Sequence, residues 1–376
     1  MFRVAIVTSQ YPESQVSFRG GVESAAYDLS CGLIDSGRLE VLVIRTLATT
    51  EKQISKYDKN VVYLPYRLKC VPGFALIVWQ HIQIYLELRR YKPDIVHVQD
   101  NSLTYYLITW PKVLTIHGFI ENEIYINSKS KINRITAKIL SKLYKFCRAK
   151  ANNLIAISDY TINKSNNSPK CNIFKIPNPL PECIKRQKVI PEYGRFLIIS
   201  RVVRAKNIDF SIRAFLNYHK SNNQSKLIIV GEIVDPCYYE ECLEIIKNYS
   251  LSECVKFIGI LERDKLYNEI SRSWALLHLS LEENAPIAIA ESLTMGVPVI
   301  GSNVGGIPEM VQDNRTGFIV NDNNSESEVV SKMIKMSDKH IRAEFSKTAI
   351  ISSAKYSINC VVDSHINAYK YIIRNS

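Results

Sequence analysis

Two glutamates separated by seven residues lie in a segment whose pattern is informative. Residues 280–300 read Ser-Leu-Glu-Glu-Asn-Ala-Pro-Ile-Ala-Ile-Ala-Glu-Ser-Leu-Thr-Met-Gly-Val-Pro-Val-Ile. This order predicts a loop, a helix, a glycine stop and a buried strand. Pro286 fits the first helical position and Gly296 fits the stop. Glu283 then lies just before the helix, and Glu291 lies more than one turn inside it.

The start of this helix is a potential anion site. Backbone amides from Ile287 onward have no partner within the helix, and the positive end of the helix attracts an anion such as a diphosphate. Carboxylates repel phosphates but accept hydrogen bonds from hydroxyls, so Glu283 and Glu291 indicate a sugar or a ribose beside the diphosphate. A second interpretation stays open, in which Glu283 caps the helix and Glu291 is a solvated surface residue.

Two cations follow a predicted buried strand at 196–200. Arg201 and Lys206 lie in the loop after that strand. Ligands of open α/β sheets bind at the carboxyl ends of strands, where an Arg and a Lys can clamp a diphosphate. The alternative is that both residues only form surface salt bridges.

These motifs resemble those of the retaining glycosyltransferases of family 4, a group 1 glycosyltransferase family that often builds bacterial surface polysaccharide. In that family an Arg and a Lys five residues apart hold the donor diphosphate. The first glutamate lies near the hydroxyls of the donor hexose and the second on the ribose of the nucleotide. The resemblance therefore implies these roles for Arg201, Lys206, Glu283 and Glu291.

The resemblance extends to the N-terminal half of the chain. Gly20 and Gly21 follow the first predicted strand, where glycine lets the backbone approach a phosphate closely. His117 follows the apolar run 113–116, at the place where the family keeps a histidine near the reacting sugar. Without the family, the two glycines would equally fit an ordinary turn, and a histidine at a strand end is more often structural.

Two residues depart from the family pattern. The aromatic residue and the glycine that usually follow the first glutamate are Ala285 and Pro286 here. Pro286 has no backbone amide, so the amides after Ala285 offer fewer donors to the phosphates. The departure leaves the choice of donor open. Gly305 and Gly306 resemble the closing loop of the family, near the nucleotide, and also fit a turn without a ligand.

Apolar runs alternate with helical segments along the whole chain, which predicts parallel sheets covered by helices on both faces. The predicted strands lie at 4–8, 41–45, 95–98, 113–117, 154–158, 196–200, 227–231, 255–258, 275–279, 297–301 and 318–320. The resemblance implies the α/β GT-B fold, with two Rossmann-like doubly wound domains facing across a cleft. We expect an acceptor-binding domain at 1–180, joined by a C-terminal helix at about 362–376, and a donor-binding domain at 181–361. The polar segment 181–193 is the expected linker.

Composition predicts a globular protein without a metal or an organic cofactor. The chain has 376 residues, 46% of them hydrophobic. Its nine cysteines have no zinc-type spacing and are expected to be reduced and mostly buried, which favours the cytoplasm. We find neither an export signal nor an apolar run of the roughly 20 residues that a membrane span needs. An Asp-x-Asp motif is absent, which argues against the metal-dependent glycosyltransferase architecture.

The chain has a formal net charge of +12, and many of its cations crowd one segment. Basic residues between 129 and 150 include Lys138, Lys142 and Lys145, and Ile132, Ile135, Ile139, Leu143 and Phe146 form an apolar stripe at helical spacing. Such a helix fits an anionic membrane surface on the inner face of the cytoplasmic membrane, or an acceptor surface. It equally fits a helix that packs its stripe on its own sheet. Nucleic acid is a poorer partner, because no groove-reading motif accompanies the charge.

The combined expectation is a retaining hexosyltransferase that uses a nucleoside-diphosphate sugar. The acceptor would be a saccharide on an undecaprenyl-diphosphate carrier, in the synthesis of a lipopolysaccharide O-antigen or a capsule. Two other functions stay open. One is a nucleotide-sugar epimerase on the same fold. The other is a non-catalytic subunit that binds nucleotide sugar or serves as a membrane scaffold.

Overall fold

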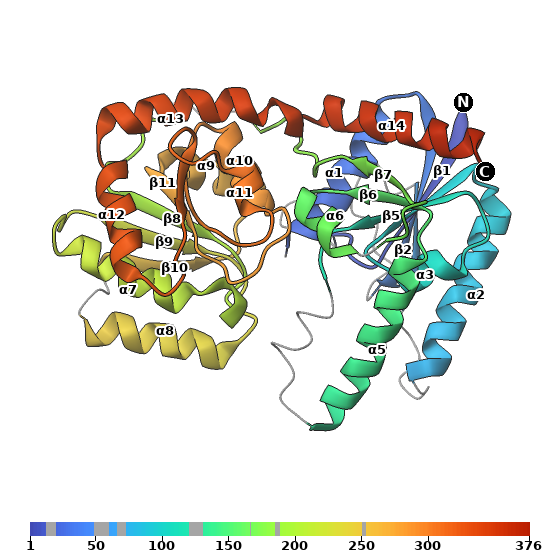
Figure 1. The fold of residues 1–376 in the computed structure, drawn as a ribbon, viewed down its shortest axis with the longest axis horizontal. Helices are drawn as coiled ribbons and strands as arrows, with labels where there is room; N and C mark the ends of the chain where they lie inside the picture. Colours follow the sequence, from blue (N-terminus) through green and yellow to red (C-terminus); the bar gives the residue numbers. More distant parts are fainter. Residues whose placement is uncertain are drawn as a thin grey trace. The chain divides into compact units, whose positions relative to one another are not determined.

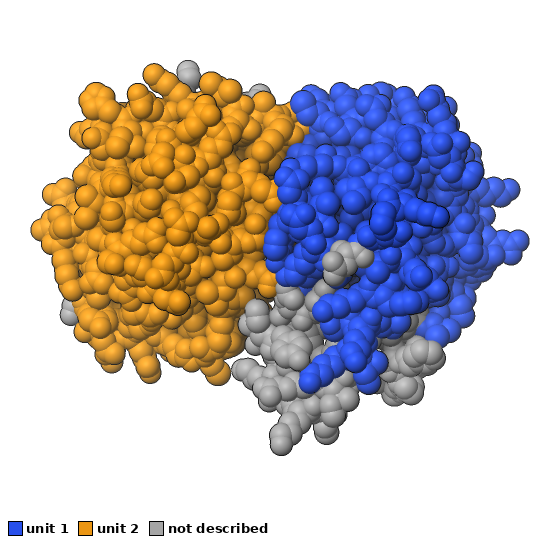
Figure 2. All heavy atoms as spheres, viewed as in Figure 1, with its two compact units in different colours: residues 1–15, 22–179, 358–376 blue, residues 16–21, 180–357 orange. Residues whose placement is uncertain are grey.

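The computed structural model describes residues 1–12, 20–48, 60–65, 73–119, 131–165, 167–184, 189–249 and 253–376 (Figure 1). Lys129 of the basic segment and residues 185–188 of the predicted linker lie outside the described residues. The chain divides into two compact units, coloured separately in Figure 2. Unit 1 contains the described residues of 1–15, 22–179 and 358–376, and unit 2 those of 16–21 and 180–357.

Unit 1 is built on a sheet whose described strands all pair in parallel. In spatial order these strands are β3 (Val61–Pro65), β2 (Leu39–Ala48), β1 (Phe2–Thr8), β4 (Ile95–Gln99), β5 (Lys112–Ile116), β6 (Asn153–Ala156) and β7 (Asn172–Lys175). Every residue of β4 is buried, as expected for a central strand with helices on both faces.

The helices of unit 1 form two layers on this sheet. They are α1 (Gly21–Asp35), α2 (Gly73–Tyr91), α3 (Ser102–Leu107), α5 (Lys131–Ala149), α6 (Asp159–Ser165) and α14 (Ile358–Arg374). The apolar faces of α1 and α14 share one core with the sheet. Those of α2 and α3 share the core on the other face, and α5 packs on α3. Figure 1 shows α14, in red, lying along this unit although it comes from the end of the chain.

Unit 2 contains a second parallel sheet with the same winding. In spatial order its described strands are β10 (Val255–Gly259), β9 (Lys226–Val230), β8 (Arg195–Ile199), β11 (Ala275–His278), β12 (Val299–Ser302) and β13 (Gly317–Val320). Its helical segments are η2 (Arg204–Lys206), α7 (Ile208–His219), α8 (Pro236–Asn248), α9 (Arg263–Arg272), α10 (Ile287–Thr294), α11 (Ile307–Met310), α12 (Glu326–Met336), α13 (Lys339–Ser352) and η3 (Ser353–Tyr356).

The structure confirms the predicted doubly wound parallel sheets. It adds two strands that the sequence did not reveal, β3 and β7. β7 reads Asn-Ile-Phe-Lys and has no fully buried residue, because it lies at the edge of its sheet. A short edge strand therefore lacks the apolar run that marked its neighbours. The compact units divide at residues 179–180 and 357–358, where the sequence suggested 180–181 and 361–362.

The expectation of mostly buried cysteines was wrong. None of the eight cysteines in the described residues forms a disulfide. Only Cys147 and Cys242 are buried, whereas Cys183, Cys237 and Cys360 are exposed. A cysteine side chain is small enough to lie at the surface without a large hydrophobic penalty, so its residue type alone is a weak indicator of burial.

Two buried histidines join α14 to the sheet of unit 1. His97 on β4 is fully buried, with Nδ1 2.7 Å from Tyr369 Oη and Nε2 2.6 Å from Thr115 Oγ1. The ring of His365 lies 5.7 Å from that of His97, and its Nδ1 donates to the carbonyl of Val361. Burial lowers the pKa of His365 to about 4 and that of His97 well below the ordinary value. Both rings are therefore neutral at pH 7.

Acid should weaken unit 1 through these histidines. The unfolded chain binds protons near pH 6.5 while the folded rings stay neutral, so stability falls as the pH decreases from about 6.5 to 4. We expect His365 alone to contribute up to about 3 kcal/mol of this loss. Urea unfolding at pH 5 and pH 7 should show a smaller pH effect in His365→Leu than in the wild type. His340→Leu, on an exposed residue of α13, should leave the pH effect unchanged; equal effects in all three proteins would contradict the assignment.

Candidate functional site

The sheet of unit 2 has a switch point between β8 and β11. From β8 the chain builds β9 and β10 on one side, and it then returns to add β11, β12 and β13 on the other. The loops that leave β8 and β11 therefore diverge at their carboxyl ends and leave a position for a ligand. Arg201 and Lys206 follow β8, and Glu283 follows β11.

The carboxylate of Glu283 gathers three donors on one oxygen. Lys206 Nζ forms an ion pair and hydrogen bond with Glu283 Oε1. His278 Nε2 lies 2.9 Å from the same atom, and Ser280 Oγ donates to it at 3.1 Å. The side chains of Lys206 and Glu283 are 18% and 12% exposed, so solvent screens the pair only weakly. The alternative role of Glu283 as a helix cap is wrong, because Pro286 is the residue that precedes α10 and the Glu283 carboxylate accepts from Lys206, His278 and Ser280 instead.

These donors fix the charge of the carboxylate. Burial raises the pKa of Glu283, but the Lys206 ammonium and the His278 hydrogen bond lower it by more, so the pKa lies well below that of an ordinary glutamate. Glu283 is an anion at any physiological pH. Within the described residues, no hydrogen bond reaches its second oxygen, Oε2, which leaves that atom available to accept from a ligand hydroxyl.

Neighbouring loops hold the backbone of residues 280–283 on both sides. The amide of Leu281 donates to the carbonyl of Ala205 at 2.9 Å. On the other side, the hydroxyl of Ser302 donates to the Ser280 carbonyl, and the amide of Gly306 donates to the Glu283 carbonyl. The loops after β8, β11 and β12 thus form one hydrogen-bonded unit around the carboxylate.

Gly305 explains why this loop contains a glycine pair. Its φ is +56°, and a Cβ atom there would lie 1.7 Å from the carbonyl oxygen of Glu283. Only glycine permits both the backbone conformation and the close approach. The packing of the chain is therefore sufficient to require glycine at this position, whether or not a ligand lies nearby.

The helix after Glu283 begins one residue later than predicted. Pro286 is the residue before α10 rather than its first residue, and its carbonyl accepts from the amides of Ile289 and Ala290. The amides of Ile287 and Ala288 precede the first bond inside the helix and mark its positive end. Gly296 follows the helix with a φ of +70°, which confirms the predicted stop.

Glu291 is 6% exposed, so the alternative of a solvated surface residue was wrong. It lies on α10, in the turn after Ala288. Ala285 precedes the helix and is half-buried. A carboxylate with so little exposure needs polar partners, because burial of an unpartnered charge is costly.

The two cations after β8 differ in their surroundings. Lys206 belongs to the short η2 helix and contacts Glu283, whereas Arg201 is exposed next to the end of the strand. Between them, Arg204 forms a two-point ion pair with Glu241. The alternative in which both predicted residues form surface salt bridges does not describe Lys206, whose partner is the buried carboxylate.

In unit 1, His117 lies at the carboxyl end of β5 and is held by residues that follow β4. The Asp100 carboxylate accepts from the amide of His117 at 2.5 Å and from that of Gly118 at 3.3 Å. His117 Nε2 is in hydrogen-bond contact with Gln99 Oε1. Burial lowers the pKa of His117 below the ordinary value, against the opposing effects of Asp100 and Asn178, so the ring is neutral at pH 7.

Gly20 and Gly21 lie between β1 and the body of α1. Neither has a positive φ. A Cβ on Gly20 would have no atom within 4 Å, so the packing of the chain does not require glycine there. The lysines of the predicted membrane or acceptor surface, Lys138, Lys142 and Lys145, are exposed on α5.

Comparison with protein families matches most of the chain in two parts. Residues 19–181 match the model described as Glycosyltransferase Family 4, and residues 182–351 match the model described as Glycosyl transferases group 1. The chain belongs to the group 1 glycosyltransferases of family 4 type. The resemblance suggested by the sequence motifs is therefore confirmed.

The curated relatives of this glycosyltransferase are distant. It is 25% identical over 336 residues to the phosphatidylinositol N-acetylglucosaminyltransferase gpi3 subunit of Schizosaccharomyces pombe, which covers 84% of this chain and 70% of the relative. It is 26% identical over 215 residues to the N-acetyl-alpha-D-glucosaminyl L-malate synthase of Bacillus anthracis, which covers 54% of this chain and 55% of the relative. The latter match spans only about half the length of either protein.

Solved structures share the fold across the whole chain. A sucrose-phosphate synthase from Thermosynechococcus elongatus superimposes with a TM-score of 0.80 and 15% identity, with 100% of both chains covered. The Anabaena protein Alr3699/HepE, solved in complex with UDP and glucose, gives a TM-score of 0.73 and 16% identity, with 98% of this chain and 100% of that chain covered. The predicted GT-B fold is thus confirmed.

Four residues that the sequence reasoning missed hold the predicted ones. His278 and Ser280 contact Glu283, and Gln99 and Asp100 contact His117. A signal for the first pair existed, since His278 and Ser280 are polar, two positions apart and at the end of an apolar strand. Alternate strand residues share one face, so both could be expected to point to the same place.

Among the described residues, no group of three or more His, Cys, Asp or Glu side chains could hold a metal ion. The absence of a cofactor stays a prediction. Across the helices that the structure describes, none is both long and apolar enough to cross a membrane.

Loss of the His278 donor should destabilise unit 2. His278→Leu removes a hydrogen bond to a weakly hydrated anion, and we expect a loss of about 1–3 kcal/mol of unfolding free energy at pH 7. His278→Gln places an amide donor near the position of Nε2 and should recover most of the loss. Urea unfolding measures the free energy of unfolding of both variants. Equal losses in His278→Leu and His278→Gln would show that the hydrogen bond does not contribute to stability.

A methyl group at Gly305 should disrupt the site loop. Gly305→Ala combines an unfavourable backbone conformation with a collision against Glu283, and we expect a loss of more than about 2 kcal/mol. Gly259→Ala is a matched control in the same unit, because Gly259 has a φ of +72° but no atom within 4 Å of its Cβ position. Similar unfolding free energies for the two variants would mean that the collision is relieved at little cost.

Proposed function

We propose that this glycosyltransferase moves a hexosyl group, with retention of anomeric configuration, from a nucleoside-diphosphate sugar to a lipid-linked saccharide in bacterial surface polysaccharide synthesis. The contact between Lys206 and Glu283 at the start of α10 supports it most directly. It combines a cation for a diphosphate with a permanently ionised carboxylate for sugar hydroxyls. The structure of Alr3699/HepE with UDP and glucose shows that a protein of this fold binds such ligands.

Charge distribution suggests how the donor binds. Lys206 is already paired with Glu283, so further positive charge for a diphosphate comes from the exposed Arg201 and the first amides of α10. Gly20, which has open space around its Cβ position, lets backbone approach the phosphates in the way its family position implies. Gly21, at the first position of α1, adds a helix N-terminus.

Transfer then requires stabilisation of the departing diphosphate. The bond between the anomeric carbon and the β-phosphate oxygen breaks while the acceptor oxygen bonds to that carbon from the same face. The acceptor proton passes to the leaving phosphate oxygen. Arg201, Lys206 and the amides of Ile287 and Ala288 stabilise the developing negative charge. Glu283 orients the hexose through Oε2, His117 contacts the sugar as a neutral ring, and Glu291 holds the ribose.

A lipid-linked acceptor is supported by relatives and by surface chemistry. The S. pombe relative is named for transfer to phosphatidylinositol, and an Acholeplasma laidlawii relative, 22% identical over 92% of this chain, is an alpha-monoglucosyldiacylglycerol synthase. Both names describe lipid acceptors. We extend this acceptor class to the present chain, with an undecaprenyl-diphosphate carrier as the specific lipid, held at the inner face of the cytoplasmic membrane by α5.

Nucleotide binding should depend on Arg201. Thermal unfolding with UDP, GDP, ADP and their sugar conjugates should show one nucleotide that stabilises the wild type, by roughly 2.7 kcal/mol at a hundredfold excess over its Kd. Arg201→Ala should lose most of this shift because it removes an exposed cation at the carboxyl end of β8. Arg204→Ala is the control, since Arg204 lies in the same loop but is paired with Glu241. Equal shifts in both variants would remove Arg201 from the site.

Turnover should depend on Glu283 more than binding does. Glu283→Gln keeps the size of the side chain but removes its charge, and we expect at least a hundredfold slower release of nucleoside diphosphate with a nucleotide shift close to the wild type. Release can be measured with water as the acceptor and then with lipid-linked saccharide. Release of an epimerised free sugar would favour the epimerase, and nucleotide binding without any turnover would favour the non-catalytic subunit.

A further inference from the structure

Large apolar side chains are exposed on the outer face of α2. Val78, Ile82, Tyr85 and Leu86 are 44%, 50%, 46% and 49% exposed. Their spacing places them on one side of the helix, whereas Ile84 and Leu88 are buried against the sheet. Because both faces of α2 are apolar, its sequence does not reveal which face is exposed.

The stripe predicted on α5 is also exposed. Ile139, Leu143 and Phe146 are 64%, 39% and 51% exposed. The structure describes side chains of α5 only from Lys138 onward. Ile132 and Ile135 of the predicted stripe therefore lie outside the described side chains. Of the two alternatives left open by the sequence, a stripe packed on its own sheet is therefore wrong for these three residues. On α3, Tyr106 and Leu107 are 47% and 51% exposed.

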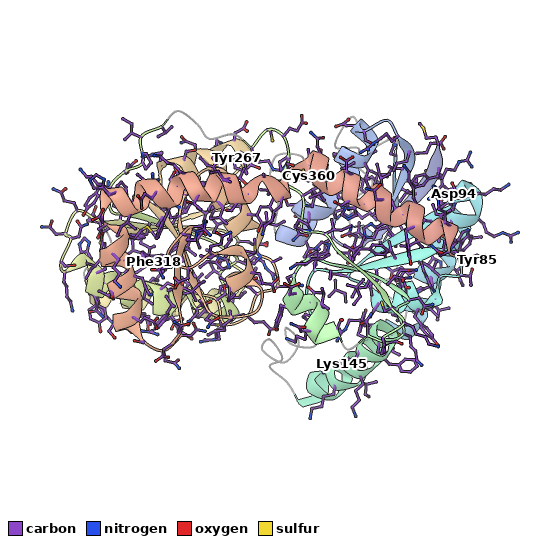
Figure 3. All side chains as sticks on the ribbon, turned by 45° about the horizontal axis from the view of Figure 1, so that its top comes forward. Tyr85, Asp94, Lys145, Tyr267, Phe318 and Cys360 are labelled. Atoms are coloured by element: carbon purple, nitrogen blue, oxygen red, sulfur yellow. The ribbon has the colours of Figure 1, made fainter. Side chains whose placement is uncertain are left out.

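Contacts between neighbouring helices make these residues one continuous surface. The rings of Tyr106 and Phe146 lie 6.0 Å apart and join α3 to α5. The ring of Tyr85 on α2 lies 5.5 Å from Trp110, which follows α3. We call the exposed apolar residues of α2, α3 and α5 the three-helix face. Figure 3 labels Tyr85 and Lys145, one on each of its outer helices.

The charges on this face have one sign. Lys138, Lys142 and Lys145 are exposed beside the α5 stripe, and none forms an ion pair within the described residues. The sequences of α2, α3 and α5 contain a single acidic residue, Glu87, which is paired with Arg90. In unit 2, α12 and α13 also carry exposed Ile and Lys residues, but acidic residues lie among them, at Glu326, Glu328 and Glu344.

We propose that the three-helix face lies on an anionic lipid bilayer, with all three helices, and not α5 alone, in the interface. Exposed apolar side chains would enter the boundary between headgroups and acyl chains, with Tyr85 and Tyr106 at headgroup level. The lysines would contact anionic headgroups. A protein partner would more often present a mixture of charges, whereas a bilayer surface complements an apolar face with cations only. The proposal deepens the proposed function, because it places the acceptor-binding unit against the source of a lipid-linked acceptor.

Vesicle flotation of the full chain tests the proposal without a sugar substrate. The protein should bind vesicles of phosphatidylcholine mixed with phosphatidylglycerol and not those of phosphatidylcholine alone, and high salt should weaken binding. Ile82→Ser with Leu86→Ser, which leaves α5 intact, should weaken binding at least tenfold. Ile334→Ser with Ile351→Ser is the matched control on α12 and α13, where these residues are 52% and 76% exposed, and it should bind like the wild type.

The charge contribution is tested in the same assay. Lys138→Gln, Lys142→Gln and Lys145→Gln together should weaken binding at least tenfold. The matched control replaces Lys335, Lys339 and Lys347 by Gln. These lysines are exposed on α12 and α13, and the control should bind vesicles like the wild type. Absence of vesicle binding by the wild type, or unchanged binding by the α2 variant, would overturn the proposal. A dimer that the wild type forms and the α2 variant does not would also overturn the proposal, because the face would then be an interface between two copies of the chain. Release of nucleoside diphosphate from the sugar donor by the same samples would show that the proposed transferase function stands even then.

Discussion

The geometry of unit 2 around its switch point depends on one carboxylate oxygen. Oε1 of Glu283 accepts from Lys206, His278 and Ser280, which come from the loop after β8 and from the end of β11 and its loop. A carboxylate with little exposure would be costly without such partners, and the ammonium of Lys206 would be equally costly alone. Each group therefore requires the other. Their pairing fixes the two divergent loops, and the Gly305 loop closes on the backbone of Glu283 from the remaining side.

This pairing limits what each residue can do for a ligand. Because Lys206 is paired with Glu283, it attracts a phosphate less strongly than an unpaired lysine would, and its ammonium also holds the carboxylate in place. A cation accessible from solvent is present at Arg201, and partial positive charge is present at the start of α10. The carboxylate keeps its second oxygen for hydroxyls. In the proposed function a diphosphate and a sugar would bind different atoms of one preorganised cluster, and little reorganisation would be needed when charge develops on the leaving group.

Periodicity in the sequence predicts most of the fold and only part of the site. Central strands such as β4 and β11 are buried on both faces and so appear as unbroken apolar runs, whereas the edge strand β7 does not. Glu283 and Lys206 were each predicted to bind the donor, yet their contact was not, because they lie 77 positions apart and meet only through the strand order. His278 was missed for a related reason: its partner depends on which loops follow neighbouring strands.

The orientation of α5 cannot be predicted from the sequence for the same reason. An apolar stripe of given spacing can face its own sheet or the outside, and local periodicity is identical in the two cases. Tertiary packing decides the orientation. α5 buries Arg148 opposite the stripe and Cys147 beside it, so Leu143 and Phe146 are left at the surface. A water-exposed stripe of this kind, continued by α3 and α2, lowers solubility and favours self-association unless something covers it. The lysines around it form no ion pair within the described residues, so a surface of negative charge with an apolar interior would complement this face, as proposed above.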